Sequence, residues 1–369
     1  MRTRQHTFPY VTCMRISIIS KSARFVLPLA AVALMGQSCT IPFFTQNANS
    51  TTDGGVFRSD DHGQTWKQHN TITVSGKAAG SLRSTSIRTL AFDPQVQDRL
   101  FASTVGNGIY VSTNGGDSWT ATSLKSGDYS CLAFQPNDHE VMYTAAGKSI
   151  LKSVDSGLHW KSVYSEAQPG ITVDCVTVSP NEPQTVWGMA SGKILRSQDG
   201  GKNWSLMVTI PAFIPRLVTF TPDGSSMTIF SRTTGIFVVD LTTMQWQDIS
   251  KPLKKLPKAS NIKSVSVVPG ATPLWVMATS YGLIRSVDSG ASWQSVSTLN
   301  SSAVTIQNVV VNPNDTNEMF ITIGNHIQRT ADGGNTWTVN SIATARTLVQ
   351  LSIDPNHVDR MFVGTFYTK

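Results

Sequence analysis

The sequence predicts an all-β protein, a seven-bladed β-propeller of four-stranded antiparallel blades. Two repeats support this prediction. One is an octapeptide of the form Ser/Thr-x-Asp-x-Gly-x-x-Trp, and the other is an alternating apolar stretch that ends in proline. Each occurs seven times, at a spacing of roughly forty to fifty residues, which is typical of solenoids, propellers and arrays.

The octapeptide is complete in five copies and altered in two. The complete copies are Ser59–Trp66, Ser153–Trp160, Ser197–Trp204, Ser286–Trp293 and Thr330–Trp337. Ser112–Trp119 has Asn114 in the Asp position, whereas Val239–Trp246 keeps only the tryptophan and has Leu241 and Thr243 where Asp and Gly belong. The frame residues are Asp61, Gly63, Trp66, Asn114, Gly116, Trp119, Asp155, Gly157, Trp160, Asp199, Gly201, Trp204, Trp246, Asp288, Gly290, Trp293, Asp332, Gly334 and Trp337.

We interpret the octapeptide as a structural turn. An Asp two residues before a Gly can bond the backbone of a tight turn, and the Gly permits positive φ. The Trp then buries a large ring between neighbouring sheets. The alternative is that these Asp residues are catalytic or bind metal, but a motif repeated around the whole chain is more often scaffold than site.

The second repeat supplies the other strands. Its copies end at Pro94, Pro136, Pro180, Pro222, Pro269, Pro313 and Pro355. Alternation with a period of two predicts a strand, and proline ends it in a turn. A further strand follows each proline, as in Arg99–Ala102. A unit is therefore strand, Pro turn, strand, Gly turn, strand, octapeptide and strand, and four strands make one propeller blade.

The two ends of the chain carry incomplete units. The octapeptide Ser59–Trp66 has no proline strand before it, and the proline strand Val349–Pro355 with its partner Met361–Phe366 has no octapeptide after it. We expect these fragments to complete one composite blade, which closes the ring and hides its sheet edges.

Three positions before each proline the sequence has a small or β-branched residue between two larger apolar ones. We expect these residues to fit the crowded axis of the ring as core, and no cofactor is implied. They are Ala91, Ala133, Thr177, Thr219, Ser266, Val310 and Ser352.

The octapeptides resemble the Asp-box of bacterial-neuraminidase-type propellers, and the resemblance covers nearly all of the chain beyond residue 53. That superfamily includes sialidases, sortilin-type receptors, xyloglucan-cleaving glycosidases and the photosystem II stability/assembly factors. The size, the single propeller and the leader are most similar to the assembly factors. The resemblance implies a protein that binds protein and has no catalytic residues.

The first 39 residues resemble a bacterial export signal. They hold five of the basic residues and no acid, so the net charge falls from +7 to +2 without them and does not argue for nucleic acid. Phe25–Gly36 is too short to span a bilayer and fits the apolar region of a signal peptide, with Met14 as a possible start. Gly36 and Ser38 before Cys39 resemble a lipoprotein box, which predicts lipidation of Cys39. Cleavage after Ser38 to give a soluble exported protein is the alternative.

We therefore divide the chain into an export signal at 1–39, a flexible tether at 40–53 and the propeller at 54–369. The protein is expected to be exported and anchored by lipid at the outer face of a bacterial membrane. It is expected to be a monomer.

Cys131 and Cys175 each lie five residues before a proline in successive units. An exported protein permits a disulfide between them, but equivalent positions on neighbouring blades can be too far apart for one. A disulfide and two buried thiols both remain open. No Cys/His spacing resembles a metal site.

The inner strands should begin at the end of the ring opposite the Asp-boxes, and the connections there are rich in basic residues. The predicted partner-binding residues are Arg88, Arg216, Lys251, Lys254, Lys255, Lys258, Lys263 and Arg346, with Lys77 and Arg83 at the same end. Arg88, Arg216 and Lys263 lie six residues before a proline and should surround the channel mouth. We expect this face to dock an acidic segment of a protein partner associated with the membrane. The alternative is a solvated basic loop.

A carbohydrate-active enzyme is the main alternative function. A sialidase needs a Tyr nucleophile and a Glu base, and Glu166 with Tyr164 is the candidate pair. Xyloglucan-type enzymes use paired Asp residues, for which Asp128 and Asp174 are candidates. A sortilin-like peptide receptor is a third possibility.

Overall fold

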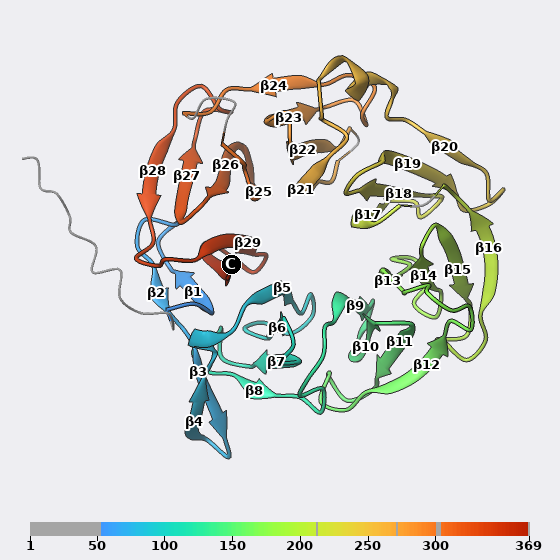
Figure 1. Ribbon diagram of the computed structural model, residues 1–369, viewed down its shortest axis with the longest axis horizontal. Coiled ribbons are helices and arrows are strands. Elements are labelled where there is room, and N and C mark those ends of the chain that lie inside the picture. Colours follow the sequence, from blue (N-terminus) through green and yellow to red (C-terminus); the bar gives the residue numbers. More distant parts are fainter. Residues whose placement is uncertain (1–52, 212, 271, 300–303, 368–369) are drawn as a thin grey trace, which may run out of the picture. The chain divides into compact units, whose positions relative to one another are not determined.

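A computed structural model describes residues 53–211, 213–270, 272–299 and 304–367. Seven four-stranded antiparallel sheets stand around a common axis (Figure 1). The predicted seven-bladed propeller is therefore confirmed. The predicted leader, including Cys39, and the tether before Asp53 lie outside the described residues.

Blades 1 to 7 follow the order of their innermost strands. These are β5 (Ile87–Phe92), β9 (Ser130–Gln135), β13 (Cys175–Val178), β17 (Pro215–Phe220), β21 (Ile262–Val268), β25 (Asn308–Asn312) and β29 (Thr347–Asp354). The second strands are β6 (Leu100–Thr104), β10 (Asp138–Ala146), β14 (Val186–Ala190), β18 (Ser226–Ser231), β22 (Leu274–Thr279), β26 (Asp315–Ile323) and β30 (His357–Phe366). The third strands are β7 (Ile109–Ser112), β11 (Ser149–Ser153), β15 (Lys193–Ser197), β19 (Gly235–Asp240), β23 (Leu283–Ser286), β27 (His326–Thr330) and β1 (Val56–Ser59). The outer strands are β8 (Thr120–Ala121), β12 (Lys161–Ser165), β16 (Ser205–Thr209), β20 (Trp246–Asp248), β24 (Gln294–Val296), β28 (Thr338–Ser341) and β2 (Lys67–Gln68).

Blade 7 is built from both ends of the chain, as the sequence predicts. Its strand order is β2-β1-β30-β29, and β1 pairs antiparallel with β30 from Val56↔Gly364 to Ser59↔Met361. Phe57, Leu351, Met361 and Val363 share one buried cluster with residues of blade 6. The ring is thereby closed by strand pairing and by a common core.

One hairpin was not predicted. β3 (Thr71–Val74) and β4 (Lys77–Ser81) project from the ring between blades 7 and 1 (Figure 1). Ser75 and Gly76 both have positive φ, which is the conformation of a tight hairpin turn. β3 is fixed to blade 1 because Thr73 N–H donates to the Trp119 carbonyl at 2.8 Å and Trp119 N–H donates to that of Thr71 at 2.8 Å. We expected Lys77 among the connections opposite the Asp-boxes, and it lies on this projecting hairpin.

Each Asp-box is a hydrogen-bonded turn between the third and outer strands. In blade 5 the Ser286 hydroxyl donates to Asp288 Oδ1 at 2.7 Å and accepts from Gly290 N at 2.8 Å. Asp288 Oδ1 also accepts from Ser292 N at 2.9 Å. In blade 1 Asn114 replaces the carboxylate, with its Oδ1 accepting from the Ser112 hydroxyl and from Ser118 N. The motif is thus a turn, as predicted, and an amide oxygen can accept the same hydrogen bonds as the carboxylate.

Blade 4 lacks the Asp-box turn. There Asp240 caps the turn instead, accepting from Thr242 N at 2.9 Å and Thr243 N at 2.8 Å. Trp246 still packs edge-on against Phe237 but remains 37% exposed, whereas Trp119 of blade 1 is fully buried. Without the complete frame, the tryptophan is held less deeply between the sheets.

In blades 7 and 2 a basic residue immediately before the Asp-box joins neighbouring blades. Arg58 donates to the Gly115 carbonyl at 2.7 Å, and Lys152 donates to that of Gly200 at 2.9 Å. Arg196 precedes the complete Asp-box of blade 3, the blade before the broken box of blade 4, and its guanidinium lies over the Trp187 ring instead. The dipeptide Arg/Lys-Ser/Thr at the start of the Asp-box is visible in the sequence, but we did not predict that its basic residue contacts the next blade.

The Asp-box carboxylates predict how stability depends on pH. Hydrogen bonds, chiefly from the residue four positions later, lower the pKa of Asp199, Asp288 and Asp332 from 3.8 to about 2. A carboxyl group with a depressed pKa in the folded state stabilises the fold above its unfolded pKa and loses that contribution as pH falls. We therefore expect the free energy of unfolding, measured in urea, to fall between pH 4 and pH 2.

The matched control is the triple variant D199N/D288N/D332N, which copies the natural Asn114 of blade 1. It has no carboxyl group to titrate at these three turns. Its free energy of unfolding should vary less over the same pH range. An unchanged pH dependence would show that these turns do not control acid stability.

Candidate binding face at the channel mouth

All seven innermost strands line a central channel of about 1000 Å³. Ala91, Ala133, Ser266 and Ser352, at the aligned small positions, are among its wall residues, as expected. Small side chains let inner strands approach one another. For example, Val309 N donates to the Ser264 hydroxyl at 3.2 Å and Val311 N to the Ser266 hydroxyl at 3.0 Å.

The three cations six residues before a proline have different surroundings. Arg88 lies 3.3 Å from an Asp128 carboxylate oxygen, so its charge is partly balanced. Arg216 lines the channel, and its side chain forms no hydrogen bond or ion pair with any described residue. Burial and the neighbouring charge of Arg232 lower its pKa to about 10, so it stays charged at neutral pH. Lys263 is half-buried at the start of β21.

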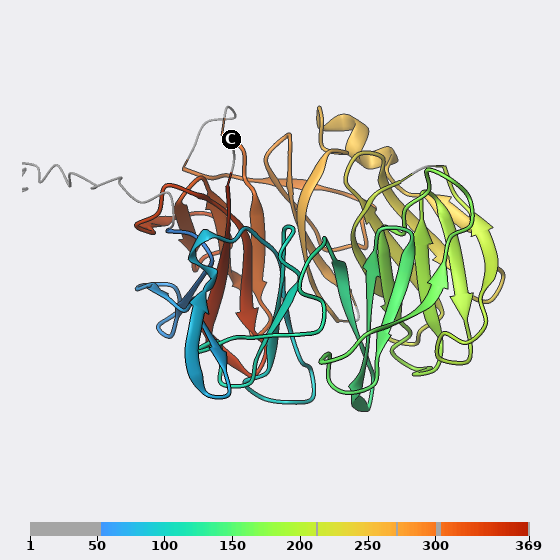
Figure 2. The same cartoon turned by 60° about the horizontal axis from the view of Figure 1, so that its bottom comes forward.

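The connection between blades 4 and 5 presents four lysines. It contains the 3-10 helix η2 (Lys251–Lys255), which stands at one end of the ring (Figure 2). Pro252 fits the first turn of this helix, and Leu253 is buried in the core of blades 4 and 5. Since Leu253 points inward, Lys251, Lys254, Lys255 and Lys258 are exposed.

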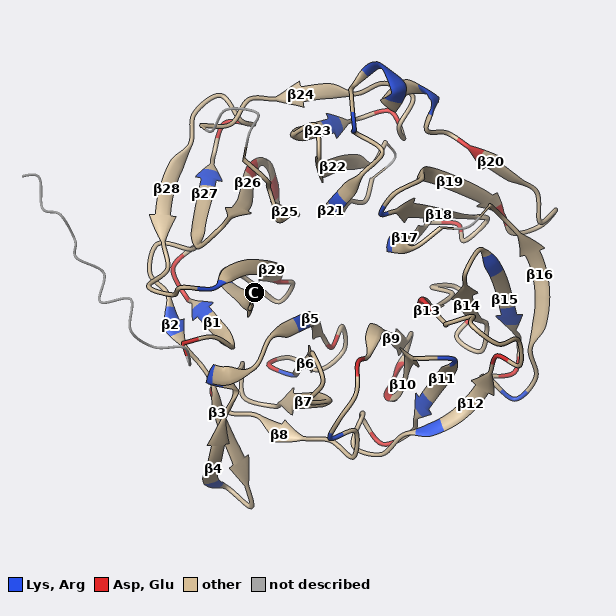
Figure 3. Ribbon diagram, viewed as in Figure 1, with Lys and Arg blue, Asp and Glu red and all other residues tan. Residues whose placement is uncertain are grey.

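We call Arg216, Arg232, Lys251, Lys254, Lys255, Lys258 and Lys263 the basic cluster. Figure 3 shows basic residues at the starts of β17 and β21 and over the connection that holds η2. Arg232 was not predicted. It is exposed in the turn after β18, and its carbonyl accepts from Ile262 N at 2.9 Å, which places it beside the start of β21. The sequence signal that could have identified Arg232 is its position between the second and third strands of its blade, where the turn lies at this end of the ring.

Arg346 is buried and is not exposed on this face. Its side chain is 6% exposed, and its Nε lies 4.0 Å from Asp53 Oδ1. Its guanidinium also lies 5.5 Å from the Tyr367 ring centroid. The prediction that Arg346 binds a partner is therefore wrong: this residue packs the beginning and the end of the propeller together.

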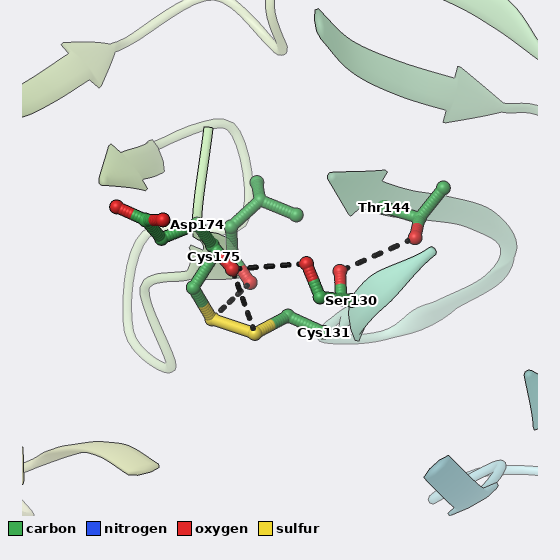
Figure 4. The surroundings of a disulfide bond; sticks show 6 residues. Ser130, Cys131, Thr144, Asp174 and Cys175 are labelled. Carbon is green, nitrogen blue, oxygen red and sulfur yellow. Dashed lines mark hydrogen bonds between the residues drawn. A yellow bond between two sulfur atoms is a disulfide. The ribbon is translucent and has the colours of Figure 1, made fainter. Parts of the chain in front are cut away.

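A disulfide joins Cys131 of β9 to Cys175 of β13 across the channel wall (Figure 4). Their Cα atoms are 5.3 Å apart, because the two inner strands are close neighbours. Ser130 strengthens the junction by donating to the Asp174 carbonyl at 3.0 Å. Asn308 occupies the equivalent position in blade 6 and donates to the Val349 carbonyl of blade 7 at 3.2 Å. The position five residues before proline thus links inner strands, here by a covalent bond.

The disulfide should stabilise the propeller. The double variant C131S/C175S is expected to lose up to about 4 kcal/mol of unfolding free energy, since the bond closes a loop with a sequence separation of 44. Urea denaturation with and without reductant measures this loss. Reductant should destabilise the wild-type chain and leave the double variant unchanged. Equal unfolding free energies of the wild-type chain and the double variant in the absence of reductant would contradict the expectation.

The candidate sialidase pair lies far from the channel wall, at the end of an outer strand. The Tyr164 hydroxyl donates to Glu166 Oε2 at 3.1 Å, and Lys193 Nζ lies 3.1 Å from the same oxygen. Burial, with the neighbouring Glu166, raises the pKa of Tyr164 to about 12. A tyrosine nucleophile needs the opposite shift. The pair therefore has the geometry of a structural ion-pair cluster.

Asp128 and Asp174 both line the channel. Asp128 accepts from Gly106 N at 2.9 Å, and Asp174 accepts from Ser191 N at 2.8 Å. Burial raises the pKa of Asp174. In the described ranges, no group of three or more His, Cys, Asp or Glu side chains could hold a metal ion. Nor does any helix in those ranges have the length and apolar character needed to span a bilayer.

Comparison with protein families matches residues 85–363 to the family described as Photosynthesis system II assembly factor YCF48, and residues 57–68 to the BNR/Asp-box repeat. The chain belongs to the YCF48 family. No curated protein matches it by sequence.

Solved structures share the fold. YCF48 bound to a D1 peptide is 15% identical, with a TM-score of 0.58 over 77% of this chain and 94% of that one. YCF48 from Cyanidioschyzon merolae is 14% identical, with a TM-score of 0.59 over 76% and 95%. The GH74 enzyme of Niastella koreensis is 19% identical, with a TM-score of 0.60 over 82% of this chain and 53% of the enzyme. The chain thus spans about half of that enzyme.

Proposed function

We propose that this protein is a non-enzymatic binding propeller that docks an acidic segment of a partner protein on the basic cluster. The proposal rests mainly on Arg216, a guanidinium in the channel wall that no described side chain balances. Burial removes part of the water that would solvate this guanidinium. An anionic group of a partner could bind it there through charge-assisted hydrogen bonds and so offset the cost of burying the charge.

The rest of the basic cluster suits the same partner. Arg232 and the four lysines of the connection between blades 4 and 5 are exposed beside the channel mouth. Charges of one sign gathered on a surface steer association with a complementary partner. YCF48 has been solved with a D1 peptide, and membership of that family supports a peptide segment as the ligand of this chain.

The cellular setting is part of the proposal. Export by residues 1–39 and lipidation of Cys39 would hold a monomeric propeller at the membrane surface. A membrane-associated protein is then the partner that it can reach. No cofactor or metal is required for this function, and no nucleic acid is involved.

The variant K254E/K255E tests the docking site. Both lysines are exposed, so folding should not change, whereas reversing two charges should weaken capture of a fluorescent Glu/Gly peptide or a D1 peptide about tenfold or more. Fluorescence anisotropy measures the change. Added salt should weaken wild-type binding in the same direction.

The matched control is K67E/K161E, which reverses two exposed lysines on outer strands away from the channel. It should bind the peptide like the wild-type chain. Equal peptide affinity of K254E/K255E and the wild type would refute docking on the basic cluster.

A glycosidase is the second candidate, because Asp128 and Asp174 line the channel and a GH74 xyloglucanase from Xanthomonas campestris shares the fold at 16% identity, with a TM-score of 0.60 over 76% of this chain and 51% of the enzyme. We expect no hydrolysis of fluorogenic sialosides or β-glucans by the purified chain. Turnover that is lost in D128N or D174N would favour the enzyme over the binding protein.

A further inference from the structure

The propeller has acidic and basic surfaces at opposite ends of its axis. We call the end with the proline turns and Asp-boxes the Asp-box end, and the end where the inner strands begin the entrance end. Of the 23 acidic residues, only Asp53, Asp128, Glu166, Asp174 and Asp248 belong to connections at the entrance end. The others lie in or next to turns of the Asp-box end, where every blade exposes at least one carboxylate, such as Asp117, Glu140, Asp223 or Asp315.

Most acids at the entrance end are neutralised. Glu166 is 7% exposed and paired with Lys193, and Asp53 lies beside Arg346. Asp128 is paired with Arg88. Asp174 interacts with Arg232, and Asp248 is exposed, so the remaining cations at this end outnumber the unpaired acids.

These cations extend beyond the basic cluster to blades 1 and 2. Arg83 precedes blade 1, Lys125 lies between blades 1 and 2, and Lys148 lies in the turn of blade 2 between β10 and β11. All three are exposed, and none forms an ion pair with a described residue. We call them the far-side cations, because blades 4 and 5 carry the basic cluster on the other side of the channel (Figure 3).

The chain enters the propeller at this same end. Asp53 Oδ2 accepts from Ala345 N at 2.9 Å, and its carbonyl accepts from the Thr344 hydroxyl at 3.3 Å. Residues 344–346 lead directly into the inner strand β29. The fourteen peptide bonds from Cys39 to Asp53 can reach at most about 50 Å. A lipid anchor at Cys39 would thus be joined to the propeller at its entrance end.

From this arrangement we propose that the entrance end binds the surface of an anionic lipid bilayer. Cations of blades 1, 2, 4 and 5, on opposite sides of the channel, match a diffuse sheet of negative charge better than a single peptide segment. Most of them are lysines, which act as point charges without the directional fork of arginine. A basic surface adds electrostatic attraction to anionic lipids beside that of the lipid anchor. The acidic Asp-box end then faces away from the bilayer.

Vesicle sedimentation tests this inference with the chain starting at Thr40, which keeps the closed ring and carries no lipid. We expect binding to phosphatidylcholine vesicles that contain about one third phosphatidylglycerol, and none to phosphatidylcholine alone. The far-side variant R83Q/K125Q/K148Q should have an affinity for the anionic vesicles at least about fivefold lower than that of the wild-type chain.

The matched control K67Q/K161Q/K202Q removes three exposed lysines from outer strands and from the Asp-box end, and should change binding less than about twofold. Equal binding to both kinds of vesicle, or an equal loss in the control, would overturn the inference. The inference would also be overturned if the wild-type chain did not bind anionic vesicles and the far-side variant bound the acidic peptide more weakly. The entrance end would then bind proteins and not membranes. The membrane inference does not depend on peptide docking, since the far-side variant leaves the basic cluster intact.

Discussion

The pairing of β1 with β30 is the contact on which the rest of the propeller depends. Each blade buries its faces against its neighbours, so a ring with a gap would expose two apolar sheets. The buried clusters show this dependence: Val276 and Leu283 of blade 5 share one core with Val309 and Ile321 of blade 6. Residues 56–59 and 361–364 close the last gap. The channel, its mouth and the positions of all surface charges exist only once these two segments have met.

The charge separation is a consequence of the repeat. Antiparallel strands place the proline turn and the Asp-box of each blade at one end, and the turn between the second and third strands at the other. Because the Asp-box needs a carboxylate or amide to bind its turn, the five complete boxes bring acids repeatedly to one end. The entrance end has no such requirement, and lysine and arginine are found there in exposed connections.

Blade 4 shows what happens when the repeat is relaxed. It has lost the Asp and Gly of the box, its tryptophan is the most exposed of the motif, and the basic η2 connection follows it. Arg216 and Arg232 belong to the same blade. The blade that conforms least to the structural repeat therefore carries Arg216 and Arg232 and is followed by the connection with the four lysines of the basic cluster, as is expected where local rules yield to a binding surface.

The sequence by itself determined the seven blades, their four strands and the composite closure, because strand alternation, prolines and Asp-boxes act locally and recur with one period. It also located the lysines of residues 251–258, since a charged run in a connection must be exposed. Only the tertiary structure decided which cations are free. Arg346 is buried against Asp53 and Tyr367, Lys77 stands on a projecting hairpin, and Arg232 joins Arg216. It likewise decided that Cys131 and Cys175 are bonded, because the distance between neighbouring inner strands is set by the packing of the whole ring and not by either strand alone.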